Sequence, residues 1–155
     1  MYNHQPQNYE CPFCIVAKGG ETPYNKRSDI VFEDEKLIAF ISPKWWPNNP
    51  GHVIVIPKNH VENIYDIDEE LLAYLYKKIK QICISFKKNY KCDGTSTRQH
   101  NEPAGTQDLW HFHIHVFPRY ENDELYLQQE NSKMVTEEER KPYADKLRAY
   151  FNSKK

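Results

Sequence analysis

Three histidines occupy alternate positions in the segment WHFHIHVF, at His111, His113 and His115. In an extended strand, residues two apart lie on the same face, so the three imidazoles would lie on one face and the large apolar side chains on the other. The Cα atoms of neighbouring histidines on that face would be about 6.5 Å apart, which is close enough for two imidazoles to share a Zn²⁺ ion. A neutral imidazole can also attack phosphorus as a nucleophile. The spacing therefore predicts a chemical site and leaves both chemistries open.

The loop NEPAGTQD comes directly before this segment and carries groups that suit an anion. Asn101 and Gln107 supply amides, Thr106 supplies a hydroxyl, and Gly105 lets the backbone turn its N–H groups inward. Beside aligned histidines these donors favour a phosphate site, because phosphoryl chemistry without a metal needs donors around the developing charge.

A CxxC pair, Cys11 and Cys14, indicates a second site. No thioredoxin-like strand-to-helix context surrounds it, so zinc is favoured over redox chemistry, and a closed tetrahedral site needs two further ligands. Neither CxxC nor HxxxH recurs, which excludes a nucleic-acid zinc finger. Cys83 lies in an apolar helical stripe and is interpreted as core. The residues leave open which of these completes the site: His52, His60, His100, one histidine of the strand, or Cys92.

The elements that would position these residues indicate an α+β domain. DIVFED and KLIAFIS form a predicted hairpin, HVIVIP a buried central strand, and GTSTRQ and WHFHIHVF two further strands. A long helix is predicted to open at Asp66, with Glu69 as its capping-box partner, and to close at Gly94. A smaller C-terminal helix is predicted to open at Thr136 and to be kinked at Pro142.

Length and charge limit the classes of partner. The 155 residues suit one domain, which we place at residues 11–155 after a flexible segment at residues 1–10. A net charge of −1 gives no broad basic surface for nucleic acid or anionic lipid. No apolar run is long enough to span a bilayer and the N-terminus does not resemble an export signal, so we expect a cytoplasmic protein that binds neither nucleic acid nor membrane.

The segment from His111 to Phe117 resembles the His-φ-His-φ-His-φ-φ motif of the histidine triad (HIT) superfamily of nucleotide hydrolases and transferases. The likeness extends from CPFC through PGHVIVIPKNH and NEPAGTQD to PRY, over residues 11–120. It implies a five-stranded antiparallel sheet with one long helix and a C-terminal helix, a homodimer, and a purine nucleotide substrate.

The resemblance also implies roles for single residues. His113 would attack the α-phosphate, and His115 would bind that phosphate and help the leaving group to depart. Asn101 and the loop residues Gly105, Thr106, Gln107 and Asp108 would hold the phosphate oxygens, with His52 beside them. Ser42 stands where many relatives hold the ribose with Asp or Asn, and Asp108 stands where many carry Ser or Thr.

Zinc-containing members imply a metal site at Cys11, Cys14, His60 and His111. A fully ligated zinc has no open position, so its role would be structural. Mg²⁺ is a further cation to consider with polyphosphate substrates. We interpret Trp45 and Trp46, in the loop before the PGH segment, as an interface or the wall of a cleft rather than as readers of a base.

The function predicted from the sequence is hydrolysis of nucleotide phosphoramidates or dinucleoside polyphosphates through a nucleotidyl-histidine at His113. Two alternatives are a hydrolase with a catalytic zinc on the strand histidines and a nucleotide-binding module without turnover.

Overall fold

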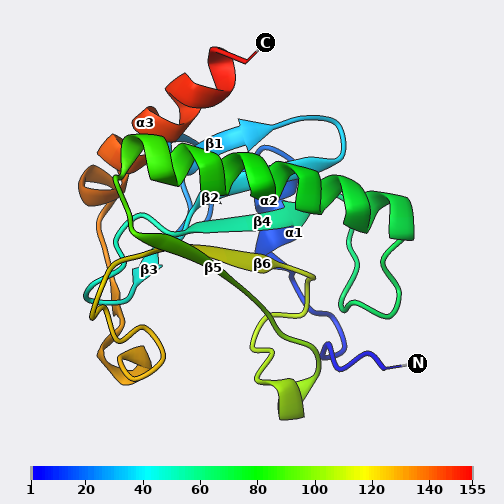
Figure 1. The fold of residues 1–155 in the computed structure, drawn as a ribbon. Coiled ribbons are helices and arrows are strands. Elements are labelled where there is room, and N and C mark those ends of the chain that lie inside the picture. Colours follow the sequence, from blue (N-terminus) through cyan, green and yellow to red (C-terminus); the bar gives the residue numbers. More distant parts are fainter. Residues whose placement is uncertain (1, 155) are drawn as a thin grey trace.

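The computed structural model describes residues 2–154 and contains a five-stranded antiparallel sheet in the order β1-β2-β4-β6-β5 (Figure 1). The strands are β1 (Ile30–Glu33), β2 (Leu37–Ile41), β4 (Val53–Pro57), β5 (Gly94–Gln99) and β6 (Ile114–Arg119). The predicted α+β class and the five-stranded sheet are confirmed. The HVIVIP segment is the central strand β4, and all five of its residues are buried.

Alternate residues of β2 and β4 face opposite layers of the fold. Ala39 and Val55 lie on the face that packs against helices α2 (Glu69–Asn89) and α3 (Glu137–Asn152). Phe40 and Ile54 lie on the opposite face, which packs against helix α1 (Pro12–Ala17). Both faces of β2 and β4 are therefore covered and excluded from solvent, which explains their unbroken apolar sequences. The histidine side chains lie on the α1 face.

Helix α2 (Glu69–Asn89) runs across one face of the sheet (Figure 1). Its N-cap is Asp68, whose side chain accepts a hydrogen bond from Leu71 N, so the predicted start at Asp66 is wrong by two residues. The predicted end at Gly94 is also wrong. Tyr90 caps the helix and Lys91 takes the left-handed turn, with φ 57°, so Gly94 is free to begin β5.

Helix α3 (Glu137–Asn152) begins with the predicted capping box between Thr136 and Glu139. It is attached to the start of β1 by a buried ion pair, in which Arg140 Nε lies 2.7 Å from Asp29 Oδ1. Pro142 is the sixth residue of the helix, where a backbone N–H would otherwise bond to the carbonyl of Glu138, so this hydrogen bond is missing; the kink at Pro142 stays a prediction.

One short helix and a pair of short strands were not predicted. Helix α1 (Pro12–Ala17) follows Cys11 and buries Phe13 and Val16 against the sheet. The strands β3 (Lys44–Trp45) and β7 (Lys133–Met134) pair as a separate two-stranded sheet. Residues before α1 contact the body of the protein through hydrogen bonds to Glu62 and Asn63; the flexibility of residues 1–10 stays a prediction.

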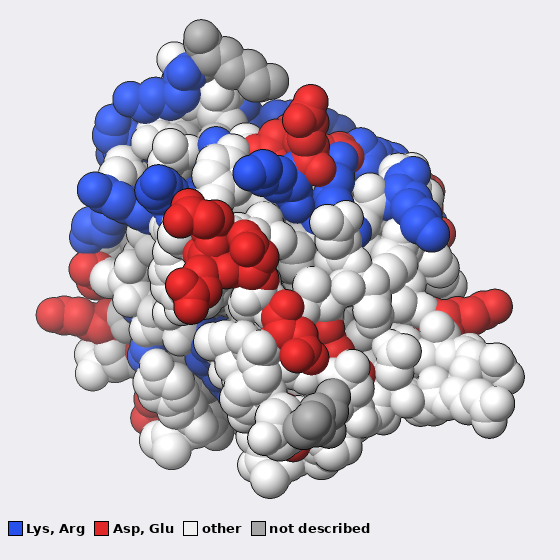
Figure 2. Space-filling model, turned by 90° about the vertical axis from the view of Figure 1, so that its right-hand side faces the viewer, with Lys and Arg blue, Asp and Glu red and all other residues white. Residues whose placement is uncertain are grey.

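The surface carries both signs of charge. On the face shown in Figure 2, Lys and Arg side chains lie mainly in the upper part and Asp and Glu side chains gather near the middle. Among the described residues, no helix is both long and apolar enough to cross a membrane.

Candidate functional site

The histidine segment is extended but joins the sheet only from Ile114 onward, so the predicted strand is shorter than expected at its N-terminal end. Phe112 N instead donates to Val61 O, outside the sheet. The alternation still holds, because Phe112, Ile114 and Val116 are fully buried in the core under α2. His111 and His113 are 0% and 5% exposed, and His115 is half-buried, so the first two line the interior of a site and the third lies at its edge.

His111 belongs to a cluster with Cys11, Cys14 and His60 whose ligand atoms all lie within 4.8 Å of one another. Its Nδ1 is 3.3 Å from Cys11 Sγ and 3.6 Å from Cys14 Sγ, and His60 Nδ1 is 3.2 Å from Cys14 Sγ. Ligands of a tetrahedral zinc, at about 2.3 Å for sulfur and about 2.0 Å for nitrogen, lie about 3.5 Å apart. The four side chains therefore match the spacing of a closed zinc site.

The orientation of both imidazoles in this cluster is set by their other ring nitrogens. His111 Nε2 donates to Pro57 O at 2.9 Å, and His60 Nε2 donates to Gln5 Oε1 at 2.9 Å. Each Nδ1 therefore carries the lone pair and faces the sulfurs, as a metal ligand requires. Burial raises the pKa of the Cys11 thiol to about 11, so a thiolate at this place needs a neighbouring cation.

The other candidate ligands named from the sequence lie elsewhere. Cys92 is buried in the core under α2, and Cys83 packs at its edge. His52 contacts His115, and His100 Nδ1 lies 2.7 Å from both Gly105 O and Thr106 Oγ1. Within residues 2–154, His113 and His115 are in no group of three or more potential metal ligands.

One ring nitrogen of His113 forms a hydrogen bond within the protein, and the other is free. Its Nδ1 lies 2.7 Å from the carbonyl oxygen of His111. Because a carbonyl only accepts, Nδ1 carries the proton and Nε2 carries the lone pair. Burial lowers the pKa of His113, although the bond to His111 O and the charge of Asp108 act in the other direction. The imidazole is therefore neutral near pH 7 with Nε2 in nucleophilic form.

The half-buried His115 contacts the fully buried His52, with His115 Nδ1 3.2 Å from His52 Nε2. Burial holds the pKa of His115 well below its usual value, and burial lowers the pKa of His52 to about 3. His52 also stacks on Phe117, with ring centroids 4.4 Å apart. Both imidazoles are neutral at physiological pH, and they share one N–H between them.

A cavity of about 150 Å³ lies in front of His113 and His115. From the upstream loop, Thr106 and Asp108 line it, together with His100. Three predicted phosphate ligands do not line this cavity, namely Asn101, Gly105 and Gln107. Both Asn101 amide atoms bond to Gln99 or Ile64, Gln107 Nε2 donates to Glu62 O and Leu109 O, and Gly105 lies in the turn Pro103–Gly105.

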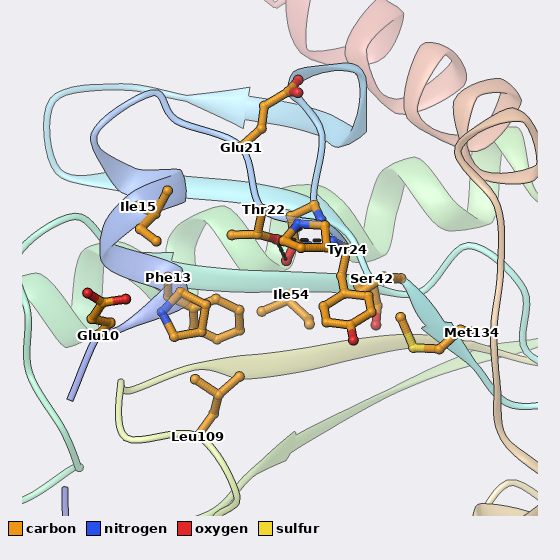
Figure 3. Close-up of a pocket in the computed structure, with 14 residues that line it drawn as sticks. Glu10, Phe13, Ile15, Glu21, Thr22, Tyr24, Ser42, Ile54, Leu109 and Met134 are labelled. Carbon is orange, nitrogen blue, oxygen red and sulfur yellow. Dashed lines mark hydrogen bonds between the residues drawn. The ribbon is translucent and has the colours of Figure 1, made fainter. Parts of the chain in front are cut away.

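A larger cavity of about 580 Å³ adjoins the first, since Phe13, Ile54 and Leu109 line both (Figure 3). Its wall is mostly apolar, and its volume suits a drug-sized or nucleoside-sized ligand. Ser42 lines it, but the Ser42 hydroxyl donates to Lys44 O and accepts from Lys44 N, which leaves one lone pair for a ligand.

Asn25 also lines the larger cavity and was missed by the sequence reasoning. Thr22 Oγ1 accepts from the backbone N–H groups of Tyr24 and Asn25, so its own proton must go to Asn25 Oδ1, 3.3 Å away. The Asn25 amide orientation is thereby fixed. Its Nδ2 is buried and has no partner in the structure. The segment TPYN contains no motif that would have identified it.

The two tryptophans, which we interpreted as an interface or the wall of a cleft, are buried, each 8% exposed. Trp45 packs edge-on against Tyr143, with ring centroids 5.0 Å apart, and donates from Nε1 to Ser42 O. Trp46 lines the smaller cavity and contacts His52 and Phe117. Trp46 is therefore a cleft wall, as one of the two predicted interpretations held.

Comparison with known proteins gives a family match over most of the site. A family model described as the HIT domain matches residues 24–122. A solved HIT-like protein of Bartonella henselae is 31% identical, with 95% of this chain and 99% of that chain covered and a TM-score of 0.77.

Two further relatives bear on the chemistry. A zinc-bound histidine triad family protein of Mycobacterium smegmatis is 25% identical, covers 94% of this chain and 98% of that chain, and has a TM-score of 0.75. The adenylylsulfatase HINT3 of Arabidopsis thaliana is 28% identical over 117 residues, which is 76% of this chain and 56% of that protein.

Proposed function

This chain belongs to the HIT family, and from that premise we propose that it is a nucleotidyl hydrolase acting through a covalent intermediate on His113. The observation that carries the proposal is the state of His113. Its Nδ1–H donates a hydrogen bond to His111 O, which leaves the Nε2 lone pair free. The His113 side chain also lines the smaller cavity, which adjoins the nucleoside-sized one. The adenylylsulfatase among the relatives supports chemistry at a nucleotide phosphate.

Each of the two cavities is assigned to a different part of the substrate. The apolar cavity, with Phe13, Ile54 and Leu109 in its wall, takes the nucleoside of a purine nucleotide, and the smaller cavity takes the α-phosphate. Of the polar residues that line this cavity, Ser42 and Asn25 are the ones we assign to the nucleoside. Thr106 and the backbone around it face the phosphate oxygens, and Asn101, Gly105 and Gln107 hold that loop in place.

The reaction follows in two displacements. His113 Nε2 attacks the α-phosphorus, the N–P bond forms, and the bond from phosphorus to the leaving group breaks with its electron pair on the leaving atom. Water then attacks the same phosphorus, the N–P bond breaks, and a nucleoside monophosphate leaves. The buried surroundings keep His113 neutral and ready for a second cycle.

His115 supplies a donor to the phosphate. When His52 Nε2–H donates to His115 Nδ1, the proton of His115 sits on Nε2, and the buried ring atom of His52 that has no partner, Nδ1, is a bare acceptor. An unpaired acceptor is tolerated better than an unpaired N–H. We therefore place an Nε2–H of His115 beside the phosphate, where it stabilises developing negative charge.

The Cys11, Cys14, His60 and His111 cluster is proposed to hold zinc. A closed Cys2His2 site supplies a structural cross-link and no open coordination position. It fixes the backbone carbonyl of His111, and this carbonyl orients His113.

The proposal is tested by trapping the intermediate. The protein is incubated with adenosine 5′-phosphoramidate or diadenosine triphosphate and quenched without acid, because the N–P bond is acid-labile. We expect a nucleotidyl adduct on His113 by peptide mass spectrometry. His113→Ala should lose adduct and turnover with an unchanged melting temperature, and His4→Ala should retain both. A wild-type protein that turns over neither substrate and carries no adduct would contradict the proposal.

A further inference from the structure

Two cations line the small cavity beside His113 and His115, namely Arg98 on β5 and Lys44 on β3. Arg98 is placed there by sheet register, since it pairs with His115 directly across β5 and β6. The guanidinium therefore lies on the same face as the proposed catalytic histidines. Asp108, an exposed residue, is the one carboxylate in the cavity wall, so the two cations exceed the acidic charge.

The Arg98 guanidinium is held by aromatic rings rather than by a carboxylate. Its central carbon lies 5.6 Å from the centroid of Trp46 and 5.9 Å from that of Phe117. Within the described residues, Arg98 forms no ion pair, and its hydrogen bond is a long one of 3.5 Å to the neutral amide of Gln129. Stacking of this kind orients the planar group and leaves its N–H donors available for an anion.

A second unpaired donor lies in the same wall. Trp46 is more than nine-tenths buried, and its Nε1–H has no acceptor in the structure. Buried N–H groups are almost always paired in native proteins, so this one points to a ligand that supplies the acceptor. The cavity thus offers positive charge and free N–H groups beyond what His113 and His115 provide.

Neither Arg98 nor His115 is well suited to protonate a leaving group. Arginine does not give up its proton in proteins, and burial keeps the pKa of His115 well below its usual value, with the charge of Arg98 lowering it further. An amine must gain a proton to depart, whereas a phosphate departs as an anion that cations stabilise directly.

We propose that Arg98, with Lys44 and Trp46, binds the phosphate or polyphosphate leaving group, so that the protein prefers phosphoanhydride substrates over phosphoramidates. This inference rests on the proposed nucleotidyl transfer to His113. In that step the bond between the α-phosphorus and the bridging oxygen breaks, the electron pair stays on the oxygen, and Arg98 and Lys44 balance the resulting charge. Arg98 is thereby a specificity-determining residue that touches the part of the substrate that leaves.

The test compares two substrates that share a nucleoside and an α-phosphate. Diadenosine triphosphate loses an anionic nucleotide, and adenosine 5′-phosphoramidate loses an amine. We expect wild type to favour the first in kcat/KM. Arg98→Gln should lower kcat/KM for diadenosine triphosphate about 10- to 100-fold, the range of a charge-assisted hydrogen bond, and change the value for the phosphoramidate less than about threefold. Arg27→Gln, an exposed arginine paired with Glu33, is the matched control.

A second measurement uses binding without turnover. Inorganic pyrophosphate should compete with diadenosine triphosphate for wild type and about tenfold more weakly for Arg98→Gln and for Trp46→Phe. Equal losses on both substrates, or no loss on either, would overturn the role of Arg98, as would a wild-type preference for the phosphoramidate. Those outcomes would not contradict nucleotidyl transfer to His113. Absence of both turnover and adduct with the two substrates would contradict that mechanism itself.

Discussion

Removal of the zinc that we propose at the Cys11, Cys14, His60 and His111 cluster should destabilise the fold before it affects any catalytic group. The cluster joins a segment near the N-terminus to residues 46 and 100 positions further along the chain. Cross-linking a loop of about 100 residues stabilises a protein by about 4.7 kcal/mol in the chain-entropy model. Binding at a free metal concentration 100 times Kd stabilises by about 2.7 kcal/mol.

We therefore expect chelation to lower the free energy of unfolding by about 3 to 5 kcal/mol. For a domain of this size each kcal/mol corresponds to about 2 to 4 °C in Tm, so the midpoint should fall by about 10 °C. The assay is thermal unfolding by circular dichroism with and without a chelator, together with zinc analysis by mass spectrometry. His60→Ala should reproduce the shift, and His100→Ala, which alters a histidine outside the cluster, should not.

The same experiment distinguishes a structural metal from a catalytic one. A catalytic zinc on the strand histidines would make turnover fall reversibly on chelation while Tm stayed unchanged. That result, or a His60→Ala protein that retains zinc and its wild-type Tm, would refute the division between His111 as a structural ligand and His113 as the nucleophile.

Three further perturbations address other parts of the structure. Asn25→Asp keeps the acceptor for Thr22 but removes the free amide donor, so adenosine monophosphate should bind about tenfold more weakly by calorimetry, with Asn131→Asp as control; unchanged affinity would contradict a contact with the nucleoside. Asp29→Asn leaves Arg140 buried and unpaired, and should lower the free energy of unfolding by about 3 to 5 kcal/mol in urea titrations; a loss below about 1 kcal/mol would show that the pair is dispensable. His52 has a pKa near 3 in the fold against about 6.5 when unfolded, so the unfolded state binds more protons between these values and stability falls as pH falls through that window. His52→Asn should remove up to about 1.4 kcal/mol per pH unit of this dependence between pH 6 and 4, and an identical slope in both proteins would exclude the buried neutral histidine.

The sheet was predictable because its strands carry strong local patterns. The apolar runs of β2 and β4 and the charged turn between β1 and β2 are signals within a few residues. The ends of α2 were harder, because Asp66 and Asp68 are both good N-cap residues. Burial of Ile67, which no local rule specifies, accompanies the choice of Asp68. The β3 and β7 pairing gave no signal, since each strand has two residues and the two lie far apart in sequence.

The candidate site was predictable only to the level of residue types. Alternation placed three histidines on one face, and the resemblance implied the ligands of a metal site that the structure brings within 4.8 Å of one another. The proposed roles of Asn25 and Arg98 depend on features that the sequence does not show, namely the hydrogen bonds around Thr22 and the register of two strands. Asn25 matters because Thr22 has used both of its lone pairs, and Arg98 because β5 pairs with β6 in one particular register.

The three histidines differ because different atoms face their ring nitrogens. Pro57 O accepts a hydrogen bond from His111 Nε2–H, which leaves the Nδ1 lone pair of His111 facing two sulfurs, while His111 O accepts from His113 Nδ1–H and leaves Nε2 of His113 free. His115 meets another imidazole and a cation across the strand pair, which suits it to charge stabilisation rather than attack. A repeat that is uniform in sequence would thus supply the proposed metal ligand, nucleophile and donor, because each histidine meets a different partner: the carbonyl of Pro57, the carbonyl of His111, or the imidazole of His52. Exchange of these roles by mutation would require moving the carbonyls, so single substitutions should remove a role without transferring it to a neighbour.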